Sequence, residues 1–189
     1  MSAKVEPLLL FAKMFFRHPR ALGSLLPSSS SLIRHLLTQV DWAEARVVVE
    51  YGPGVGTLTA EILRRLTPDG VLVAIENNAE FVAYLRRSFS DDRLHVRQAS
   101  AAEVAQVLAA LGLEQADVII SGIPYSTMPH ELREHILEQS RNLLRPGGTF
   151  LVYQFTSAVV PHLWRLFGNV RQEIEFRNLL PARIFCCVR

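Results

Sequence analysis

The stretch Arg46-Val47-Val48-Val49-Glu50-Tyr51-Gly52-Pro53-Gly54-Val55-Gly56-Thr57 decides the fold of this 189-residue chain. Its first half is a run of β-branched apolar residues, which is typical of a strand buried on both faces of a sheet. Three glycines then alternate with other residues, and helical spacing begins at Leu58. A buried strand, a tight glycine turn and a helix together bring backbone N–H groups and the positive end of a helix close to a ligand.

The spacing of these glycines and the acid before them restrict the class of ligand. A dinucleotide fingerprint of the form Gly-x-Gly-x-x-Gly is matched by Gly52 and Gly54, but Thr57 stands where the third glycine belongs. The Gly-Lys-Ser/Thr ending of a phosphate-binding Walker loop is absent. Glu50 would repel a pyrophosphate, whereas its carboxylate can hold a cation. The pattern therefore favours a cationic ligand.

The stretch from Glu50 to Gly56 resembles motif I of the S-adenosylmethionine-dependent methyltransferases, whose cofactor is cationic at its sulfur and its amino group. The resemblance implies that S-adenosyl-L-methionine is the cofactor. The cofactor contacts that it implies in this segment are Glu50, Tyr51, Gly52, Gly54, Gly56 and Thr57. The alternative is an ordinary corner between a strand and a helix.

Beyond this turn, apolar runs typical of strands alternate with segments of helical spacing. Strands are expected within residues 46–51, 71–76, 94–96, 117–122, 149–153, 171–176 and 184–188. Helices are expected at residues 32–37, 58–66, 79–89, 103–111, 129–144 and 159–167. The alternation predicts an α/β fold with a mostly parallel seven-stranded sheet, helices on both faces and an antiparallel hairpin at one edge. With the resemblance above, the expected fold is that of a Rossmann-like class I methyltransferase.

In such sheets, ligands bind beyond the carboxyl ends of the strands, near the switch point. Glu76 ends the second strand, where a carboxylate can accept hydrogen bonds from both hydroxyls of a ribose. Asn77 beside it would pack along the adenosine. After the third strand the family usually carries an aspartate that touches the adenine amino group, but this chain has Ser100 and Ala101 there. The Ser100 hydroxyl or backbone amides would have to serve instead. For Glu76, the alternative is a solvated acid at a strand end.

The fourth strand ends in Ser121-Gly122-Ile123-Pro124-Tyr125, which resembles motif IV of amine-directed methyltransferases. The resemblance implies cofactor contacts at Ser121 and Gly122 and acceptor contacts at Ile123, Pro124 and Tyr125. Serine in place of the usual Asn or Asp argues against a planar base amine and favours an alkyl amine. Tyr125 is the candidate catalytic residue, since it would orient the amine and stabilise a cationic product by roughly 0.5–2 kcal/mol through its ring. The alternative is a turn with Tyr125 packed in the core.

The N-terminal segment from Val5 to Arg17 is apolar and aromatic except for a narrow polar face. A short basic amphipathic helix of this kind suits a membrane interface, although a helix docked on the core is the alternative. The residues expected to touch an anionic membrane surface are Lys4, Lys13, Phe15, Phe16 and Arg17. We therefore expect a membrane-interacting helix at residues 1–20 and a methyltransferase domain at residues 21–189.

A serine-rich loop, Pro27-Ser28-Ser29-Ser30-Ser31, precedes the helix expected at 32–37. Capping of that helix needs only one serine. In the methyltransferase interpretation the loop would lie against the cofactor, and Ser28 is the residue expected to meet the cofactor carboxylate.

The composition sets the broad class of protein. With 49% hydrophobic and 20% charged residues, the chain suffices for one globular domain with a full core. Its formal net charge of +2 gives no indication of nucleic-acid binding. Cys186 and Cys187 are neighbours in an apolar strand and point to opposite faces, which indicates buried reduced thiols in a cytoplasmic protein. No apolar run reaches the roughly 20 residues needed to span a bilayer.

Taken together, the basic start, Gly-Ser-Leu-Leu-Pro-Ser-Ser at 23–29, the glycine loop at 50–56 and Ser-Gly-Ile-Pro-Tyr at 121–125 resemble the small bacterial phospholipid N-methyltransferases, which are related in fold to rRNA adenine dimethylases. The resemblance covers nearly the whole chain. It implies methyl transfer to the amine head group of phosphatidylethanolamine or an ornithine lipid, by a protein peripheral on the cytoplasmic face of the cell membrane.

We expect a monomer in solution that needs neither a metal nor a nucleic-acid partner. Three alternative functions remain open at this point. They are an RNA base methyltransferase, a methyltransferase for a soluble amine, and a non-enzymatic membrane-associated module with a residual cofactor pocket.

Overall fold

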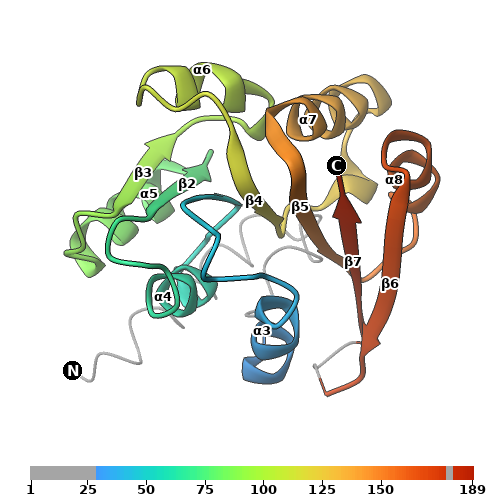
Figure 1. Ribbon diagram of the computed structural model, residues 1–189, viewed down its shortest axis with the longest axis horizontal. Coiled ribbons are helices and arrows are strands. Elements are labelled where there is room, and N and C mark those ends of the chain that lie inside the picture. Colours follow the sequence, from blue (N-terminus) through green and yellow to red (C-terminus); the bar gives the residue numbers. More distant parts are fainter. Residues whose placement is uncertain (1–28, 178–180) are drawn as a thin grey trace.

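The computed structural model describes residues 29–177 and 181–189, and the strands within these ranges form one seven-stranded sheet (Figure 1). The strands are β1 (Val47–Tyr51), β2 (Val71–Glu76), β3 (Leu94–Gln98), β4 (Ala116–Ser121), β5 (Leu144–Gln154), β6 (Asn169–Glu175) and β7 (Ala182–Val188). The α-helices are α3 (Ser30–Leu37), α4 (Thr57–Leu63), α5 (Ala79–Ser88), α6 (Val104–Ala109), α7 (His130–Leu143) and α8 (Val160–Leu166). Two short 3₁₀ turns, η2 (Ala101–Glu103) and η3 (Tyr125–Thr127), follow β3 and β4.

The strand order in the sheet is β3-β2-β1-β4-β5-β7-β6. Strands β1 to β5 pair in parallel, while β7 pairs antiparallel with both β5 and β6. The expected α/β fold, with a mostly parallel sheet and an antiparallel edge hairpin, is therefore confirmed. The strand order reverses between β1 and β4, and such a switch point is where ligands bind in this class of sheet.

Helices cover both faces of the sheet (Figure 1). Helices α6, α7 and α8 pack on one face, and α3, α4 and α5 pack on the other. Successive residues of β1 pack on opposite faces of the sheet. Val48 belongs to the core cluster under α3 and α4, whereas Val49 belongs to the cluster under α6 and α7. Both valines are 0% exposed, which explains why the residues between Arg46 and Glu50 are all apolar.

The two cysteines follow the same rule in β7. Cys186 packs in the cluster under α3 and α4, and Cys187 packs in the cluster on the opposite face. Both are free and buried, and burial raises the pKa of each thiol. The expectation of two buried thiols that point to opposite faces is confirmed.

Several element boundaries differ from those expected, and two of the differences have a cause in the hydrogen bonding. The helix expected at 103–111 begins earlier as the turn η2, because Ser100 accepts a hydrogen bond from the backbone N–H of Ala102 and caps it. Strand β5 begins at Leu144, five residues before the strand expected at 149–153. Gly147 donates its N–H to the carbonyl of Arg189, so the pairing of β5 with β7 and the residue that follows it extends into this segment.

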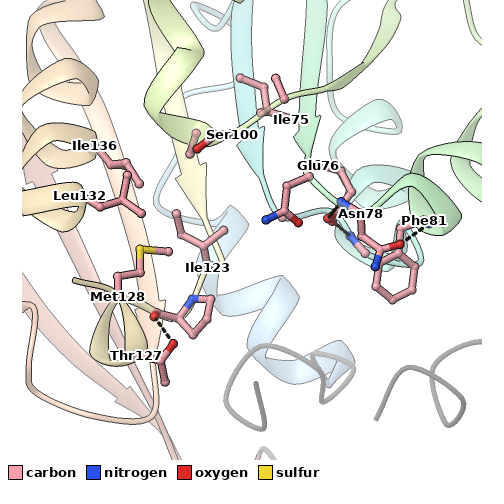
Figure 2. Close-up of a pocket in the computed structure, with 17 residues that line it drawn as sticks. Ile75, Glu76, Asn78, Phe81, Ser100, Ile123, Thr127, Met128, Leu132 and Ile136 are labelled. Atoms are coloured by element: carbon pink, nitrogen blue, oxygen red, sulfur yellow. Dashed lines mark hydrogen bonds between the residues drawn. The ribbon is translucent and has the colours of Figure 1, made fainter. Parts of the chain in front are cut away.

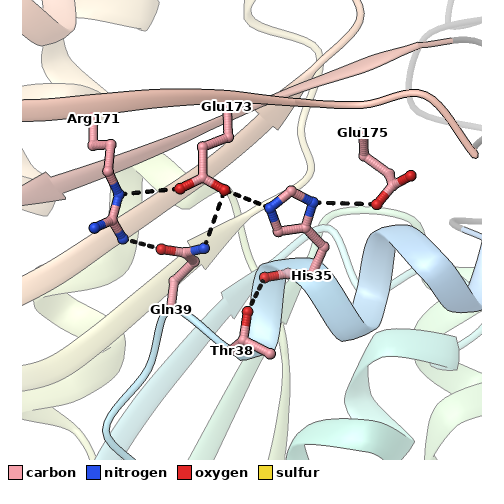
Figure 3. A network of polar contacts seen from close by, with 6 residues as sticks. All are labelled: His35, Thr38, Gln39, Arg171, Glu173 and Glu175. Atoms are coloured by element: carbon pink, nitrogen blue, oxygen red, sulfur yellow. Dashed lines mark hydrogen bonds and ion pairs between the residues drawn. The ribbon is translucent and has the colours of Figure 1, made fainter.

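A polar network ties α3 to the edge strand β6 (Figure 3). The imidazole of His35 lies between two carboxylates, 3.2 Å from Glu175 and in direct contact with Glu173. Arg171 pairs with the other oxygen of Glu173 at 3.2 Å and bonds to Gln39. The hydrogen bond to Glu173 is the main cause that raises the pKa of His35. This network fixes the start of the described chain against the far edge of the sheet.

No helix in the described part of the chain is long and apolar enough to cross a bilayer. The helix expected at residues 1–20, with the membrane contacts assigned to it, lies outside the described residues, and so does Ser28. The division of the chain at residue 20 therefore stays a prediction.

Candidate active site

A cavity of about 440 Å³ opens at the carboxyl ends of β1, β2, β3 and β4 (Figure 2). The strand register explains why these ends meet: Tyr51 at the end of β1 lies beside Ile75 of β2 and Ser121 of β4. The residues that line the cavity are Gly52, Gly54, Ile75, Glu76, Asn77, Asn78, Phe81, Ala99, Ser100, Ala101, Gly122, Ile123, Pro124, Thr127, Met128, Leu132 and Ile136.

The glycine loop forms the floor of the cavity. Gly52, Gly54 and Gly56 have φ angles of 72°, 56° and 78°, a region of the backbone map that favours glycine. A Cβ atom at Gly54 would meet no atom within 4 Å, so the space above this residue is open to the cavity. A Cβ at Gly52 would lie 2.9 Å from Cγ2 of Ile123, so the absence of a side chain lets the β4 loop approach.

Gly56 has a different part in the structure. A Cβ atom there would lie 2.6 Å from the ring of Phe89 and 2.7 Å from Leu85, both of which belong to the α5 region. Gly56 is buried and does not line the cavity. The absence of a side chain at Gly56 allows α5 to pack against the start of α4, so the described structure gives this glycine a packing role.

Glu76 stands at the polar side of the cavity, with only 7% of its surface exposed. Its two carboxylate oxygens accept backbone N–H groups, one from Gly54 at 3.2 Å and one from Asn78 at 2.9 Å. Burial raises the pKa of this carboxyl, and the N–H groups partly offset that shift. The side chain is thereby locked in one orientation at the end of β2 and links the glycine loop to the start of α5.

Glu50 lies beneath the glycine loop and is 1% exposed. Thr59 of α4 donates a 2.7 Å hydrogen bond to it. Burial raises the pKa of Glu50 to about 8, although the bond from Thr59 acts in the opposite direction. Glu50 does not line the cavity. Direct contact between its carboxylate and a ligand in the cavity is therefore absent from this arrangement.

The opposite side of the cavity is apolar. We call the set Ile123, Pro124, Met128, Leu132 and Ile136 the apolar wall, which the β4 loop and α7 build together (Figure 2). Leu132 is 38% exposed at this wall, whereas Ile136 is buried. Gly122 lies beside the wall, where a Cβ atom would be 2.1 Å from the hydroxyl of Tyr153.

Tyr125 departs from the expected position at the acceptor site. It is 0% exposed, belongs to the core cluster under α7, and does not line the cavity. Its hydroxyl lies 3.0 Å from the hydroxyl of Ser121, which is also buried. The apolar surroundings of β4 and α7 account for this: the ring gains more from burial than it would at the cavity edge, and Ser121 satisfies its hydroxyl.

The structure thus divides the predicted site residues into three groups. Those that line the cavity are Gly52, Gly54, Glu76, Asn77, Ser100, Ala101, Gly122, Ile123 and Pro124. Those that lie beneath or beside it are Glu50, Tyr51, Gly56, Thr57, Ser121 and Tyr125. The third group comprises Ser28 and the N-terminal membrane contacts, which lie outside the described residues.

Several lining residues were not predicted. Asn78 caps α5 by accepting N–H groups from Glu80 and Phe81, and the Asn-x-x-Phe pattern at the end of a strand was the available signal. Leu132 and Ile136 are four residues apart on one face of α7, a spacing visible in the sequence. What the sequence did not indicate was that this face meets the cavity rather than the core alone.

Comparison with known proteins places this arrangement in a family. Residues 24–177 match the family described as methyltransferase small domain. The chain is 34% identical over 185 residues to an ornithine lipid N-methyltransferase of Singulisphaera acidiphila, covering 97% of this chain and 96% of that protein. It is 28% identical over 116 residues to ribosomal RNA small subunit methyltransferase A of Clostridium perfringens, a match that spans 61% of this chain and 40% of that protein.

A solved structure supports the same fold. Human methyltransferase-like protein 13 in complex with SAH superposes with a TM-score of 0.66 at 16% identity, covering 85% of this chain and 83% of that one. The cavity fits such a cofactor, because the open space over Gly54 gives room beside a carboxylate that is already held by backbone N–H groups. The chain therefore belongs to the methyltransferase small domain family, as an enzyme whose methyl donor is S-adenosylmethionine.

Proposed function

We propose that this enzyme transfers methyl groups to the amine head group of a membrane lipid, either an ornithine lipid or phosphatidylethanolamine. The observation that carries the proposal is the apolar wall, which presents no charged side chain to the methyl acceptor. The ornithine lipid N-methyltransferase that matches over nearly the whole chain supports the same substrate class.

The residues of the polar side would hold the cofactor. Gly54 leaves room along the floor, and the carboxylate of Glu76 would accept the ribose hydroxyls. Asn77 and Ser100 flank the same side, where the adenosine would lie. When bound, S-adenosylmethionine supplies an electrophilic methyl group on a sulfonium, and the chain must align the amine with it.

The acceptor amine must be neutral when it attacks, although a free alkyl amine has a pKa of about 10. The apolar wall would lower that pKa, because exclusion of water disfavours the charged form of an amine. Among the described residues that line the cavity, Glu76 is the one ionisable side chain, and its oxygens already accept backbone N–H groups. We therefore expect the proton of the amine to pass to water rather than to a protein base.

Delivery of the lipid would involve the N-terminal segment. We propose that residues 1–20 bind an anionic membrane surface through Lys4, Lys13, Phe15, Phe16 and Arg17, on the strength of their basic and aromatic pattern. Leu132, half-exposed on the apolar wall, would then face the lipid that enters the cavity.

The test is transfer of radiolabelled methyl from S-adenosylmethionine to a panel of acceptors. The panel holds vesicles with ornithine lipid, vesicles with phosphatidylethanolamine, structured and unstructured RNA, and ethanolamine as a soluble amine. We expect label in an organic-extractable lipid, whose chromatographic mobility counts the methyl groups added.

The controls separate the proposal from its alternatives. Gly54→Ala should remove lipid labelling, because the new methyl group would enter the cavity. Gln172→Ala, at an exposed position, should leave lipid labelling unchanged. Label confined to RNA would contradict the proposal and favour the RNA base methyltransferase. Label confined to ethanolamine would favour a soluble substrate instead.

A further inference from the structure

A second cluster of reactive side chains lies between α7 and α8. His130 and Glu134 are one helical turn apart on α7, and His162 projects from α8. One ligand atom from each of the three lies within 4.8 Å of the other two, and the two imidazole rings meet edge to face with centroids 5.6 Å apart. In the described part of the chain this is the one such cluster of three.

The cluster is separate from the cavity. Leu132 and Ile136, which line the cavity, stand two residues away from His130 and Glu134 along α7. Two residues correspond to a rotation of about 200° around a helix, so the cluster and the apolar wall occupy opposite sides of α7. None of the three residues lines the cavity, so the methyltransferase site does not account for them.

The carboxylate of Glu134 contacts a guanidinium with one oxygen and an imidazole with the other. Its oxygen Oε2 pairs with the guanidinium of Arg165, which belongs to α8. Its other oxygen, Oε1, is buried and lies in direct contact with Nδ1 of His162. Together with the ring of His130, these groups bring two imidazoles and one carboxylate oxygen close enough for a single cation to join them.

Two imidazole nitrogens and one carboxylate oxygen are ligands suited to zinc. We propose that His130, Glu134 and His162 bind a Zn²⁺ ion that joins α7 to α8. Arg165 then acts as the partner that orients the ligating carboxylate through its second oxygen. Three protein ligands leave the fourth position of a tetrahedral site to water.

The ion serves the structure around the methyltransferase site. Helix α7 carries Leu132 and Ile136 to the apolar wall, and α8 holds α7 from the other side. The ion fixes the first two turns of α7, from which these side chains project. This proposal opposes the expectation that the protein needs no metal, which stays a prediction. Because the third ligand comes from a different helix, no short sequence motif marks the site.

Calorimetric titration of the full-length, tag-free, EDTA-treated protein with Zn²⁺ tests the proposal. We expect about one equivalent bound, a rise of about 5–10 °C in Tm at a hundredfold excess over Kd, and an absorption spectrum of tetrahedral Co²⁺ when cobalt replaces zinc. His130→Gln, Glu134→Gln and His162→Gln should each weaken binding by roughly tenfold or more.

His135→Gln is the matched control, because this exposed histidine lies on α7 outside the cluster. It should bind Zn²⁺ as the wild-type chain does. His130 is exposed at the start of α7, so His130→Gln should fold even if a substitution at the less exposed His162 does not. Absence of saturable binding in the wild-type chain, or binding that His130→Gln leaves unchanged, would overturn the proposal.

Discussion

The side-chain amide of Gln154 donates a 2.8 Å hydrogen bond to the backbone carbonyl of Ile123. Gln154 ends β5 and is 7% exposed, whereas Ile123 is the central residue of the loop that follows β4. The bond therefore fixes, from a neighbouring strand, the backbone of the loop that opens the apolar wall. Gln154 does not itself line the cavity, so it is a positioning residue.

Replacement of Gln154 by Met removes this bond while it keeps the length of the side chain. The carbonyl of Ile123 keeps the backbone N–H of Tyr125 at 3.0 Å, so the variant loses one hydrogen bond, worth about 0.5–1.5 kcal/mol. We therefore expect kcat/KM for the acceptor to fall roughly 2- to 10-fold. The Kd for the cofactor should change by less than about threefold, because the polar side of the cavity is untouched. Steady-state kinetics and calorimetric titration with S-adenosylmethionine measure the two quantities.

Gln172→Met, on the exposed surface of β6, is the control for the chemical change itself. It should leave both quantities at wild-type values. Equal losses of cofactor and acceptor affinity in Gln154→Met would mean that the substitution disturbs the whole cavity, and the positioning role would then be wrong.

The hydroxyl pair of Tyr125 and Ser121 distinguishes a structural from a chemical role for Tyr125. Since the ring is buried and its hydroxyl meets Ser121 at 3.0 Å, Tyr125→Phe should lower Tm by about 2–4 °C with turnover within about threefold of wild type. Tyr125→Ala leaves a cavity and should cost about 3–5 kcal/mol. Thermal unfolding and acceptor kinetics check both variants, with Ser121→Ala as the partner control.

A hundredfold loss of turnover in Tyr125→Phe at unchanged Tm would restore the sequence-based hypothesis. The hydroxyl would then act on the amine, and the ring would have to leave its buried position during the reaction. A loss of turnover that follows the loss of stability instead agrees with the buried arrangement.

Replacement by alanine should lower cofactor affinity at Gly54 and thermal stability at Gly56. Both have positive φ, which costs an alanine roughly 1–2 kcal/mol. At Gly54 the added Cβ meets open space, so the chain should fold but bind S-adenosylmethionine at least about tenfold more weakly. At Gly56 the Cβ collides with Phe89 and Leu85, so the loss should be mainly in Tm.

Thermal unfolding and cofactor titration on both variants separate these outcomes. The double variant Gly56→Ala with Phe89→Leu is the control. It should regain part of the Tm that Gly56→Ala loses, because leucine lacks the ring that the new Cβ meets. If Gly56→Ala loses cofactor affinity at wild-type Tm, the assignment of a packing role to Gly56 is wrong.

The same residues show how far sequence reasoning reaches. The burial of the β1 valines could be predicted because it follows from the local apolar pattern. The place of Glu76 at the cavity could be predicted because ligands bind at the carboxyl ends of strands in such sheets. The distinct roles of Gly54 and Gly56 were not, because they depend on where α5 places Phe89. The orientation of Tyr125 could not be predicted either, because the pentapeptide that ends in Tyr125 is compatible with a ring in the core or at the cavity.

The N-terminal segment gives a prediction independent of the cavity. If residues 1–20 bind an anionic surface, a chain that lacks residues 1–18 should lose co-sedimentation with phosphatidylglycerol vesicles. Its far-UV circular dichroism should remain that of a folded α/β protein. Lys13→Glu combined with Arg17→Glu should reproduce the loss without truncation, because like charges repel the segment from the surface.

Vesicle binding at raised salt concentration separates the electrostatic contribution of the basic residues from the apolar contribution. At about 1 M ionic strength the Debye length falls to roughly 3 Å, so binding that depends on lysine and arginine should weaken strongly. A folded truncated chain that still binds vesicles as the full chain does would contradict the assignment of residues 1–20 to the membrane.

Glu50 makes the stability of the cofactor-free protein depend on pH. Its pKa is raised to about 8 by burial, above the value near 4.5 of an exposed glutamate, so the folded state holds a proton that the unfolded state has lost. This contribution is fully present below about pH 4.5 and is lost as pH rises through about 8, by an amount on the order of 5 kcal/mol. The free energy of unfolding from urea titrations should therefore decline across that range.

Glu50→Gln isolates this effect from other titrating groups such as His35. The amide cannot ionise, so the decline should be smaller in the variant, and at pH 8 its stability should equal or exceed that of the wild-type chain. Thr59 can still donate its 2.7 Å hydrogen bond to the amide oxygen, which keeps the local packing. An identical pH dependence in both proteins would show that Glu50 is already ionised when buried, with a partner that compensates its charge. In that case an ionised carboxylate lies beneath the glycine loop, which is the charge state that the sequence first indicated for Glu50.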